Sequence, residues 1–486
     1  MSTLFQSPPT QPPSKPANPT LILITMVVCT IAILSFFLFY NFVMPQAPSR
    51  LERPSEALID EVPIWSTVAS FPLPFMQNPQ TVAALIILFT AAVFAFYGLA
   101  AYLSLKFQLP RVCRWLIPAA AAFFSFLSIW ALPTVNSDIY YHIMQAHIAL
   151  FHNQNPYYVS TLEFPTDPLY IYVSQPYRHL VSVYPTAWTI FTIIPTLLSG
   201  SEPVANLLAL RFTLWLFNLA NIVLVAQILR RLNPQLQLTG MILYGWNPII
   251  AVLGQSKPDT IMAFFLLAAC LLLILNHASL AIVDLTLSAL VKLITLPLVL
   301  AFILWQVIHR DWWGTLTSTL IAGFTTLMLY APFLQEPGLV LRHLEEVNRG
   351  ASAFPSGIRL ILIAAFFMVL LYSTFKGNTI QNRLHGWTII MLYFAIFFTT
   401  PVNSWYLISL IALVSITPSL PMIWMAVPIS GFSFFLNSWE ITSSDTFRLP
   451  ALLPSRASIY VILTGIVAIS IILVMARRLR TATAKP

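Results

Sequence analysis

Charged residues are scarce in this sequence: they make up 8% of its 486 residues, whereas 58% are apolar. A soluble protein of this length would need far more Lys, Arg, Asp and Glu to cover its surface. The apolar residues form long runs, many of about 18 residues or more, which match the ~30 Å hydrocarbon core of a bilayer. Membrane β-barrels are excluded, because their strands alternate and run only about ten residues. The sequence therefore predicts an all-α integral membrane protein with almost no soluble domain.

Cysteine is also scarce, and its three positions are Cys29, Cys113 and Cys270. No two of them have the spacing of metal ligands, and no disulfide framework follows from them. The net charge of +8 does not indicate nucleic acid, because most Lys and Arg residues lie in short loops between apolar runs. We therefore expect no nucleic-acid partner.

The apolar runs predict about 13–14 transmembrane helices. The candidate spans are 21–44, 80–105, 115–133, 184–200, 207–229, 237–254, 259–277, 280–305, 314–333, 357–374, 385–400, 405–418, 420–436 and 456–476. The first run is too long for a signal-peptide core and lacks a small-residue cleavage site, so we interpret it as an uncleaved signal anchor. We expect residues 1–20 to form a Pro-rich, disordered cytoplasmic tail, residues 21–476 the transmembrane domain and residues 477–486 a basic cytoplasmic tail.

Loop charges predict the orientation. Three segments carry Lys and Arg without any acid: 106–114, 375–383 and 477–486. All three lie in the cytoplasm if both termini of a plasma-membrane protein do, and the segment 45–79, with two basic and four acidic residues, then lies outside. Arg230 and Arg231 conflict with this count, because they fall outside. Either the 184–200 segment is re-entrant or this loop breaks the rule; the count of fourteen keeps 184–200 as a span.

The outer segment 134–183 is rich in Tyr, Pro, Asn, His and acids, too polar for lipid and too aromatic for a linker. Such a loop is a candidate functional site. Ser137 is a plausible N-cap for a helix over Ile139–Phe151, on which Asp138 and His142 lie one turn apart. The apolar stripe of that helix predicts that it lies along the membrane interface. The alternative for Asp138 is a first-turn acid that complements the helix dipole.

The three histidines His142, His147 and His152 do not indicate a metal. Their spacing of five and five does not place them on one helix face, and no acid-rich cage is nearby. We expect them to be interfacial or substrate-contacting side chains.

The order of short motifs in this loop resembles a known family. Asp138 precedes Tyr140-Tyr141, and the motifs Asn155-Pro156-Tyr157, Asp167-Pro168 and Tyr184-Pro185 follow. This order is similar to the first outer loop of C-type (GT-C) membrane glycosyltransferases, above all the polyprenol-phosphate-mannose-dependent mannosyltransferases of bacterial cell envelopes. The later family-like motifs are Trp246-Asn247-Pro248, Asp259 and the apolar run after it, Val291-Lys292 and Trp405-Tyr406. The resemblance covers about residues 80–420. The sequence departs from the family pattern at Ser137, Thr186, Lys257-Pro258 and Ser404.

The resemblance implies an inverting transfer of a sugar, mannose in that family, from a polyprenyl-phosphate donor to a glycan or glycolipid acceptor, with Asp138 as the general base. It implies no cofactor and no metal. Candidate cations for the donor phosphate are Arg178, His179, Arg211, Lys257 and Lys292. The other candidate donor-binding or substrate-binding residues are Tyr141, His142, Asn155, Tyr157, Asp167, Tyr184, Asp259, Trp405 and Tyr406.

Several alternatives stay open. Lys292 could snorkel to an interface, Lys257 could be a cytoplasmic loop residue, and Arg211 could anchor a span. Trp405 and Tyr406 could belong to an aromatic belt. For the whole chain, the alternatives are a lipid or sugar transporter or flippase, and a non-catalytic membrane subunit of the same ancestry.

Overall fold

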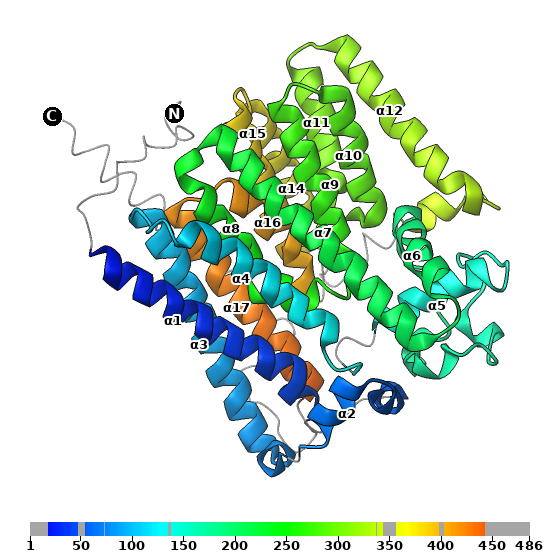
Figure 1. Cartoon of the computed structure of the whole chain (residues 1–486). Helices are drawn as coiled ribbons and strands as arrows, with labels where there is room; N and C mark the ends of the chain where they lie inside the picture. The colour runs from blue at the N-terminus through cyan, green and yellow to red at the C-terminus, as the bar shows by residue number, and fades with distance from the viewer. Residues whose placement is uncertain are drawn as a thin grey trace.

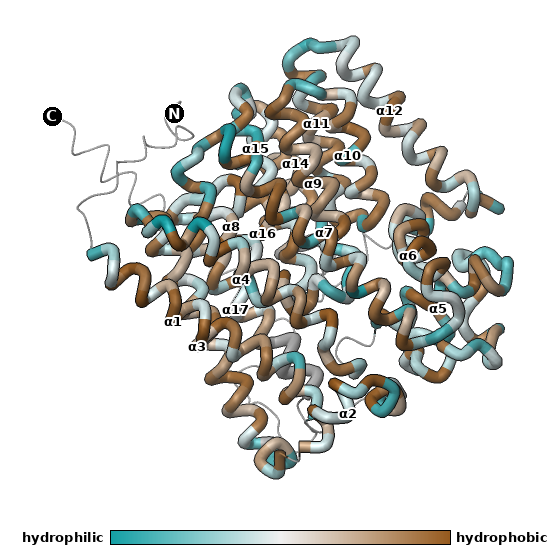
Figure 2. Tube along the Cα trace, viewed as in Figure 1, coloured by the Kyte–Doolittle hydropathy of each residue, from teal (hydrophilic) through white to brown (hydrophobic). Residues whose placement is uncertain are grey.

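The structure, a computed structural model, describes residues 18–46, 54–71, 73–134, 138–336, 338–343, 356–397 and 403–442. These residues form helices and connecting turns, and no strand occurs among them (Figure 1). Hydrophobic residues run along the helices, whereas hydrophilic residues concentrate at helix ends and in the connecting loops (Figure 2). The expectation of an all-α membrane protein is therefore confirmed.

Five helical segments are long and apolar enough to cross a membrane: Pro19–Gln46, Gln80–Lys106, Cys113–Trp130, Pro203–Leu232 and Trp312–Phe333. They contain α1 (Pro19–Leu38), α3 (Pro79–Lys106), α4 (Cys113–Leu127), α7 (Pro203–Leu232) and α12 (Trp312–Tyr330). The shorter helices beside them are α6 (Thr186–Ser199), α8 (Gln237–Gly245), α9 (Asp259–Ile274), α10 (Ala278–Val291), α11 (Leu296–Ile308), α14 (Ser356–Phe375), α15 (Ile380–Phe397), α16 (Ile408–Ile416) and α17 (Leu420–Thr442). The expected span 456–476 lies outside the described residues, and the total number of spans stays a prediction.

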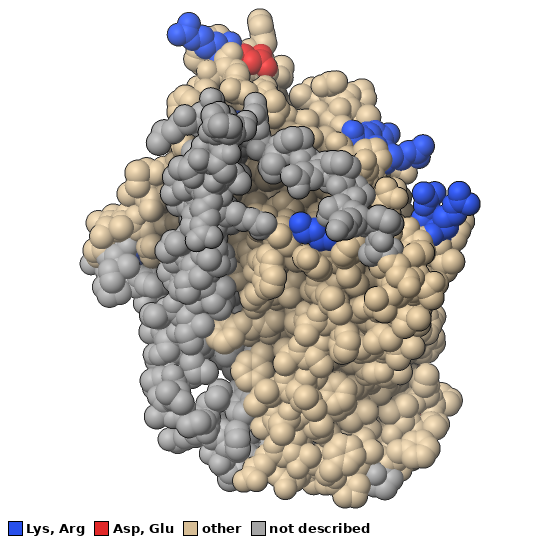
Figure 3. Space-filling model, turned by 90° about the vertical axis from the view of Figure 1, so that its left-hand side faces the viewer, with Lys and Arg blue, Asp and Glu red and all other residues tan. Residues whose placement is uncertain are grey.

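The helices α4 and α7 define the two ends of the bundle. The indole N–H of Trp215 donates to the carbonyl of Ala122 at 3.2 Å, and Arg211 donates to the carbonyl of Ala131, just beyond α4, at 2.6 Å. The two helices are therefore antiparallel, and Arg231 near the end of α7 lies at the same end as the start of α4. We call this the basic end and the opposite one the site end. In Figure 3, which faces the left side of Figure 1, nearly all visible charged side chains are Lys or Arg.

The helix α6 is 14 residues long and does not connect the two ends of the bundle, whereas a crossing of the membrane by 184–200 would require it to do so. Its first turn lies beside α5 (Asp138–Leu150), where the Trp188 ring contacts His142. Its last turn leads to the start of α7, where the Asn206 amide donates to the carbonyl of Gly200 at 2.7 Å. Since α7 starts at the site end, α6 both begins and ends there. This course is the one that the re-entrant alternative describes, and Arg231 lies at the basic end, while the number of membrane crossings stays a prediction.

The expected span 280–305 is two helices rather than one. The backbone is extended at Lys292 (φ −159°, ψ 125°), between α10 and α11. Pro297 lies in the first turn of α11. A proline there cannot donate to the carbonyl of residue 293, and its ring clashes with that carbonyl, so the helix stops and restarts. The break leaves Lys292 at the site end, where α9 also begins.

The helix after Asp138 forms as expected, but it is more deeply buried than the prediction requires. Ten of the thirteen residues of α5, from Ile139 to Ile148, are buried. It packs against α6 and α7 (Figure 1). The helix is therefore covered more completely than its predicted apolar stripe requires, and its position along the membrane interface stays a prediction. The proposed N-cap, Ser137, lies outside the described residues.

Candidate functional site

The ammonium of Lys257 pairs with the carboxylate of Asp138, the residue at the start of α5. Lys257 comes from the turn before α9, and 119 residues separate the two in the sequence. The Lys257 side chain is 2% exposed, whereas that of Asp138 is 28% exposed. The site therefore joins a buried cation to a carboxylate that solvent or a ligand can still reach. Lys257 therefore lies at the site end of the bundle.

Asp138 is held in its charged form. Burial raises the pKa of its carboxyl group, but the charge of Lys257 and the hydrogen bonds that the carboxylate accepts together lower the pKa to below its usual value. Tyr177 also donates a hydrogen bond to the carboxylate. An ionised, partly exposed carboxylate is what a general base requires. The Asp138 carboxylate also interacts electrostatically with His142, one turn further along α5, as their i, i+4 spacing predicts.

A second ion pair joins Lys292 to Asp259. The Lys292 ammonium donates to both carboxylate oxygens of Asp259, at 2.9 and 2.8 Å. The side chains are 8% and 0% exposed, respectively. The pair forms because α9 and α10 are an antiparallel hairpin, which brings the start of one beside the end of the other. Lys292 therefore does not snorkel to an interface.

The aromatic residues of the Trp405-Tyr406 motif cover the two lysines. The Lys257 ammonium lies 3.9 Å from the centre of the Trp405 ring, and the Lys292 ammonium 4.1 Å from the centre of the Tyr406 ring. The buried Tyr184 ring lies 5.7 Å from the Lys292 ammonium. Cation–π contacts of this kind hold a desolvated cation in place. These rings are part of the cation site rather than of an aromatic belt.

The ring of His142 completes this side of the site. It packs 5.2 Å from both the Tyr184 and the Trp188 rings. Burial and, to a smaller extent, the charge of Lys257 lower the pKa of His142 to about 3. The imidazole is therefore neutral at physiological pH, and its buried Nε2 atom has no hydrogen-bond partner in the structure. It is available to a ligand but not as a cation.

Other buried polar atoms near the lysines also lack partners. They include the indole N–H groups of Trp188 and Trp405 and both amide atoms of Gln255. Buried polar groups are normally paired, so unpaired ones clustered around two cations favour a polar ligand. Sequence reasoning missed Gln255. Its place two residues before Lys257 was a weak signal, because an amide in an apolar run is equally typical of helix packing.

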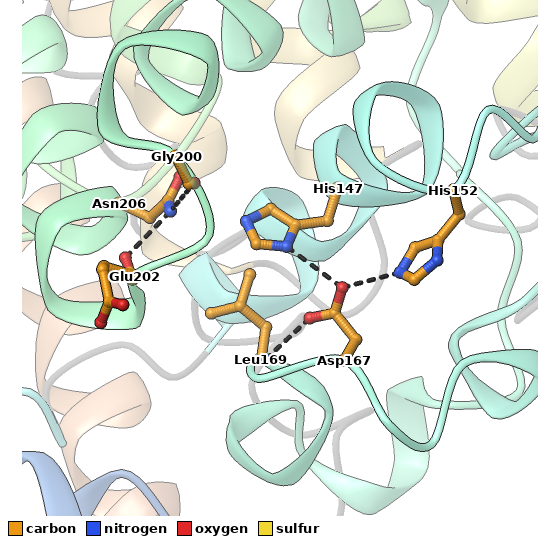
Figure 4. Close-up of polar contacts among 7 residues, drawn as sticks. All are labelled: His147, His152, Asp167, Leu169, Gly200, Glu202 and Asn206. Atoms are coloured by element: carbon orange, nitrogen blue, oxygen red, sulfur yellow. Dashed lines mark hydrogen bonds and ion pairs between the residues drawn. The ribbon is translucent and has the colours of Figure 1, made fainter.

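Asp167 belongs to a separate cluster within the outer loop (Figure 4). Its carboxylate accepts hydrogen bonds from the His147 ring at 3.2 Å and the His152 ring at 2.8 Å, and from the Leu169 backbone N–H at 2.8 Å. Burial raises the pKa of Asp167, but these hydrogen bonds lower it to below the usual value overall. The three partners occupy the carboxylate, so Asp167 ties the loop to α5.

The loop motif Asn155-Pro156-Tyr157 is also structural. The Asn155 amide donates to the carbonyl of Phe333 at 2.7 Å, and the buried Tyr157 hydroxyl lies 2.7 Å from that of Thr189. Tyr141 donates to the carbonyl of Val181 at 2.7 Å. These bonds fix the outer loop to α6 and to the end of α12, and the Tyr141 ring also packs 5.8 Å from the ring of Tyr177, which donates to Asp138.

The remaining candidate cations lie away from the two ion pairs. Arg178 donates to the backbone carbonyls of Val173 and Ile171, and Arg211 donates to those after α4. The His179 side chain is exposed. Arg211 is buried and anchors α7, which is the alternative role that the sequence left open for this residue. Only Lys257 and Lys292, of the five candidates, meet an acid and an aromatic ring.

No group of three or more His, Cys, Asp and Glu residues could hold a metal ion in the part of the chain that the structure describes. The absence of a metal stays a prediction. No protein-family model, curated protein or solved structure matches this chain.

Proposed function

We propose that the protein is an inverting glycosyltransferase that uses a polyprenyl-phosphate sugar, with a glycan or glycolipid as acceptor. The observation that carries this proposal is the partly exposed Asp138 carboxylate next to the buried ammonium of Lys257. A transferase of this class needs a base for the acceptor hydroxyl and a cation for the phosphate that leaves. Mannose is the sugar that the sequence resemblance favours.

The reaction is a single displacement at the anomeric carbon. The acceptor oxygen forms a new bond to that carbon, while the bond from the carbon to the donor phosphate oxygen breaks and its electron pair stays on the phosphate. Asp138 takes the proton of the acceptor hydroxyl, and an ammonium stabilises the charge on the phosphate. Inversion follows because base and leaving group lie on opposite faces of the sugar.

The proposal places this reaction outside the cytoplasm, in the plasma membrane. The basic end carries Arg230, Arg231 and the basic residues of 106–114, and positive loops favour the cytoplasmic side. The site end then faces outward. A lipid-phosphate sugar presents its reactive carbon at the surface of the membrane, and Asp138 follows the end of α4 at that level.

A second candidate is a proton-coupled carrier for a lipid or sugar. Two Asp–Lys pairs at helix ends, each with a buried lysine, favour it, because ionisable groups of this kind form proton relays in transporters. Interrupted helices at a polar site, such as the break at Lys292, occur in carriers as well.

The test is transfer of a radiolabelled sugar by the purified protein from a lipid-phosphate donor to an acceptor extract. The proposal expects labelled glycan or glycolipid and release of lipid phosphate in equal amounts. Absence of transfer with every lipid-phosphate sugar, together with proton-driven uptake into liposomes, would replace the transferase by the carrier.

A further inference from the structure

We infer that Lys257 is the cation that binds the anionic ligand, and that the ligand binds by displacing Asp138 from it, while Lys292 stays paired with Asp259. The inference rests on the proposed function, because it takes the anion to be a lipid phosphate. It identifies one of two lysines that the sequence does not distinguish.

The two ion pairs differ in the number of hydrogen bonds between lysine and carboxylate and in the burial of the carboxylate. Lys292 donates to both oxygens of Asp259, which has no exposed surface. If a ligand drew Lys292 away, it would leave a buried carboxylate without a cation, which is costly. Lys257 contacts a single oxygen of Asp138, whose side chain is 28% exposed. Water and Tyr177 can solvate Asp138 after Lys257 turns to another anion.

The surroundings of Lys257 allow this change of partner. The Trp405 ring, 3.9 Å away, holds the ammonium whichever anion it faces. The indole N–H of the same ring is buried without a partner, and so is the amide of Gln255, two residues before Lys257. These donors supply the hydrogen bonds that a phosphate needs once it has left water.

The exchange has a consequence for the reaction. Asp138 and the ligand phosphate compete for one ammonium, so binding of the phosphate frees the carboxylate from the cation that depresses its basicity. The base therefore becomes effective only when the donor is in place. In the site without a ligand, Asp138 stays paired with Lys257.

The test is binding of farnesyl phosphate to the purified full chain in detergent, measured by calorimetry, with farnesol as the uncharged control. Asp138→Asn removes the competing charge, so we expect farnesyl phosphate to bind about tenfold more tightly or better than to wild type, the size expected for a charged hydrogen bond. Lys257→Gln should lose the preference for farnesyl phosphate over farnesol. Asp138→Glu keeps the charge and should bind like wild type.

A matched control is Asp167→Asn, which removes a carboxylate from the same loop but away from Lys257, and should leave the affinity unchanged. Gel filtration shows whether each variant is folded, and Lys257→Gln still tests the inference if Asp138→Asn is not folded. Equal or weaker binding by folded Asp138→Asn, or a retained phosphate preference in Lys257→Gln, would overturn the inference. Tighter binding by Asp138→Asn in a protein that transfers no sugar would uphold the inference and remove the proposed function.

Discussion

The buried pair Asp259–Lys292 predicts a large and specific loss of stability when one partner is removed. Lys292→Met leaves a carboxylate with 0% exposure without its two hydrogen bonds of 2.9 and 2.8 Å. Breaking a buried ion pair in this way costs about 3–5 kcal/mol, whereas replacing both partners by apolar residues is often neutral. We therefore expect Lys292→Met to unfold more readily than wild type by about that amount.

The compensating variant distinguishes an unpaired charge from lost packing. Asp259→Leu combined with Lys292→Met should recover most of the lost stability, because no uncompensated charge remains in the bundle. Lys106→Met, at the end of α3, removes an ammonium that the structure leaves partly exposed and should cost less than about 1 kcal/mol.

The measurement is the free energy of unfolding from a titration with sodium dodecyl sulfate in mixed micelles, followed by tryptophan fluorescence. Wild-type stability in Lys292→Met would refute the reasoning, as would a double variant no more stable than the single one. Either result would mean that the pair does not hold α9 and α10 together.

Two further predictions concern topology and pH. Cysteines introduced by Gln154→Cys and Glu202→Cys should react with a membrane-impermeant thiol reagent in intact cells, and Arg231→Cys should not; the three native cysteines are buried and give little background. Labelling of Gln154→Cys with protection of Glu202→Cys would instead make α6 a crossing helix. The lowered pKa of Asp167 means that its stabilisation of the outer loop is complete above the unfolded value of about 3.9 and is lost as the pH falls through the folded value. Backbone hydrogen exchange near Leu169 should therefore become faster below about pH 4 in the wild type. In Asp167→Asn it should already be fast at neutral pH, and equal exchange in both proteins at neutral pH would contradict this role.

The sequence predicts the class of fold because helix length and apolar composition are set by the bilayer. It does not predict the course of every run. Residues 184–200 and 280–305 are apolar enough to cross, but α6 begins and ends at the site end, and the second run breaks at Lys292, shortly before Pro297. An apolar composition indicates that a segment contacts lipid or the protein interior, but it does not indicate the direction in which the segment runs.

Most residues of the candidate site were predicted from the sequence, but the pairing of its acids and lysines was not. Asp138 and Lys257 are 119 residues apart, and Asp259 and Lys292 are 33 apart. Nothing in their local sequence indicates which acid meets which lysine, because the helix packing decides it. Arg178, Arg211 and Asp167 read equally well as ligands from sequence, but their hydrogen bonds hold the protein itself together.

The most direct test of the central claim compares sugar transfer by Asp138→Asn and Asp167→Asn at matched expression. The amide isostere caps a helix about as well as Asp but cannot take a proton. The account predicts that Asp138→Asn loses turnover by about 10²–10⁴-fold, and that Asp167→Asn keeps most of its activity if the loop stays folded. Near-normal transfer by Asp138→Asn would contradict the claim, and loss in Asp167→Asn alone would move the base there.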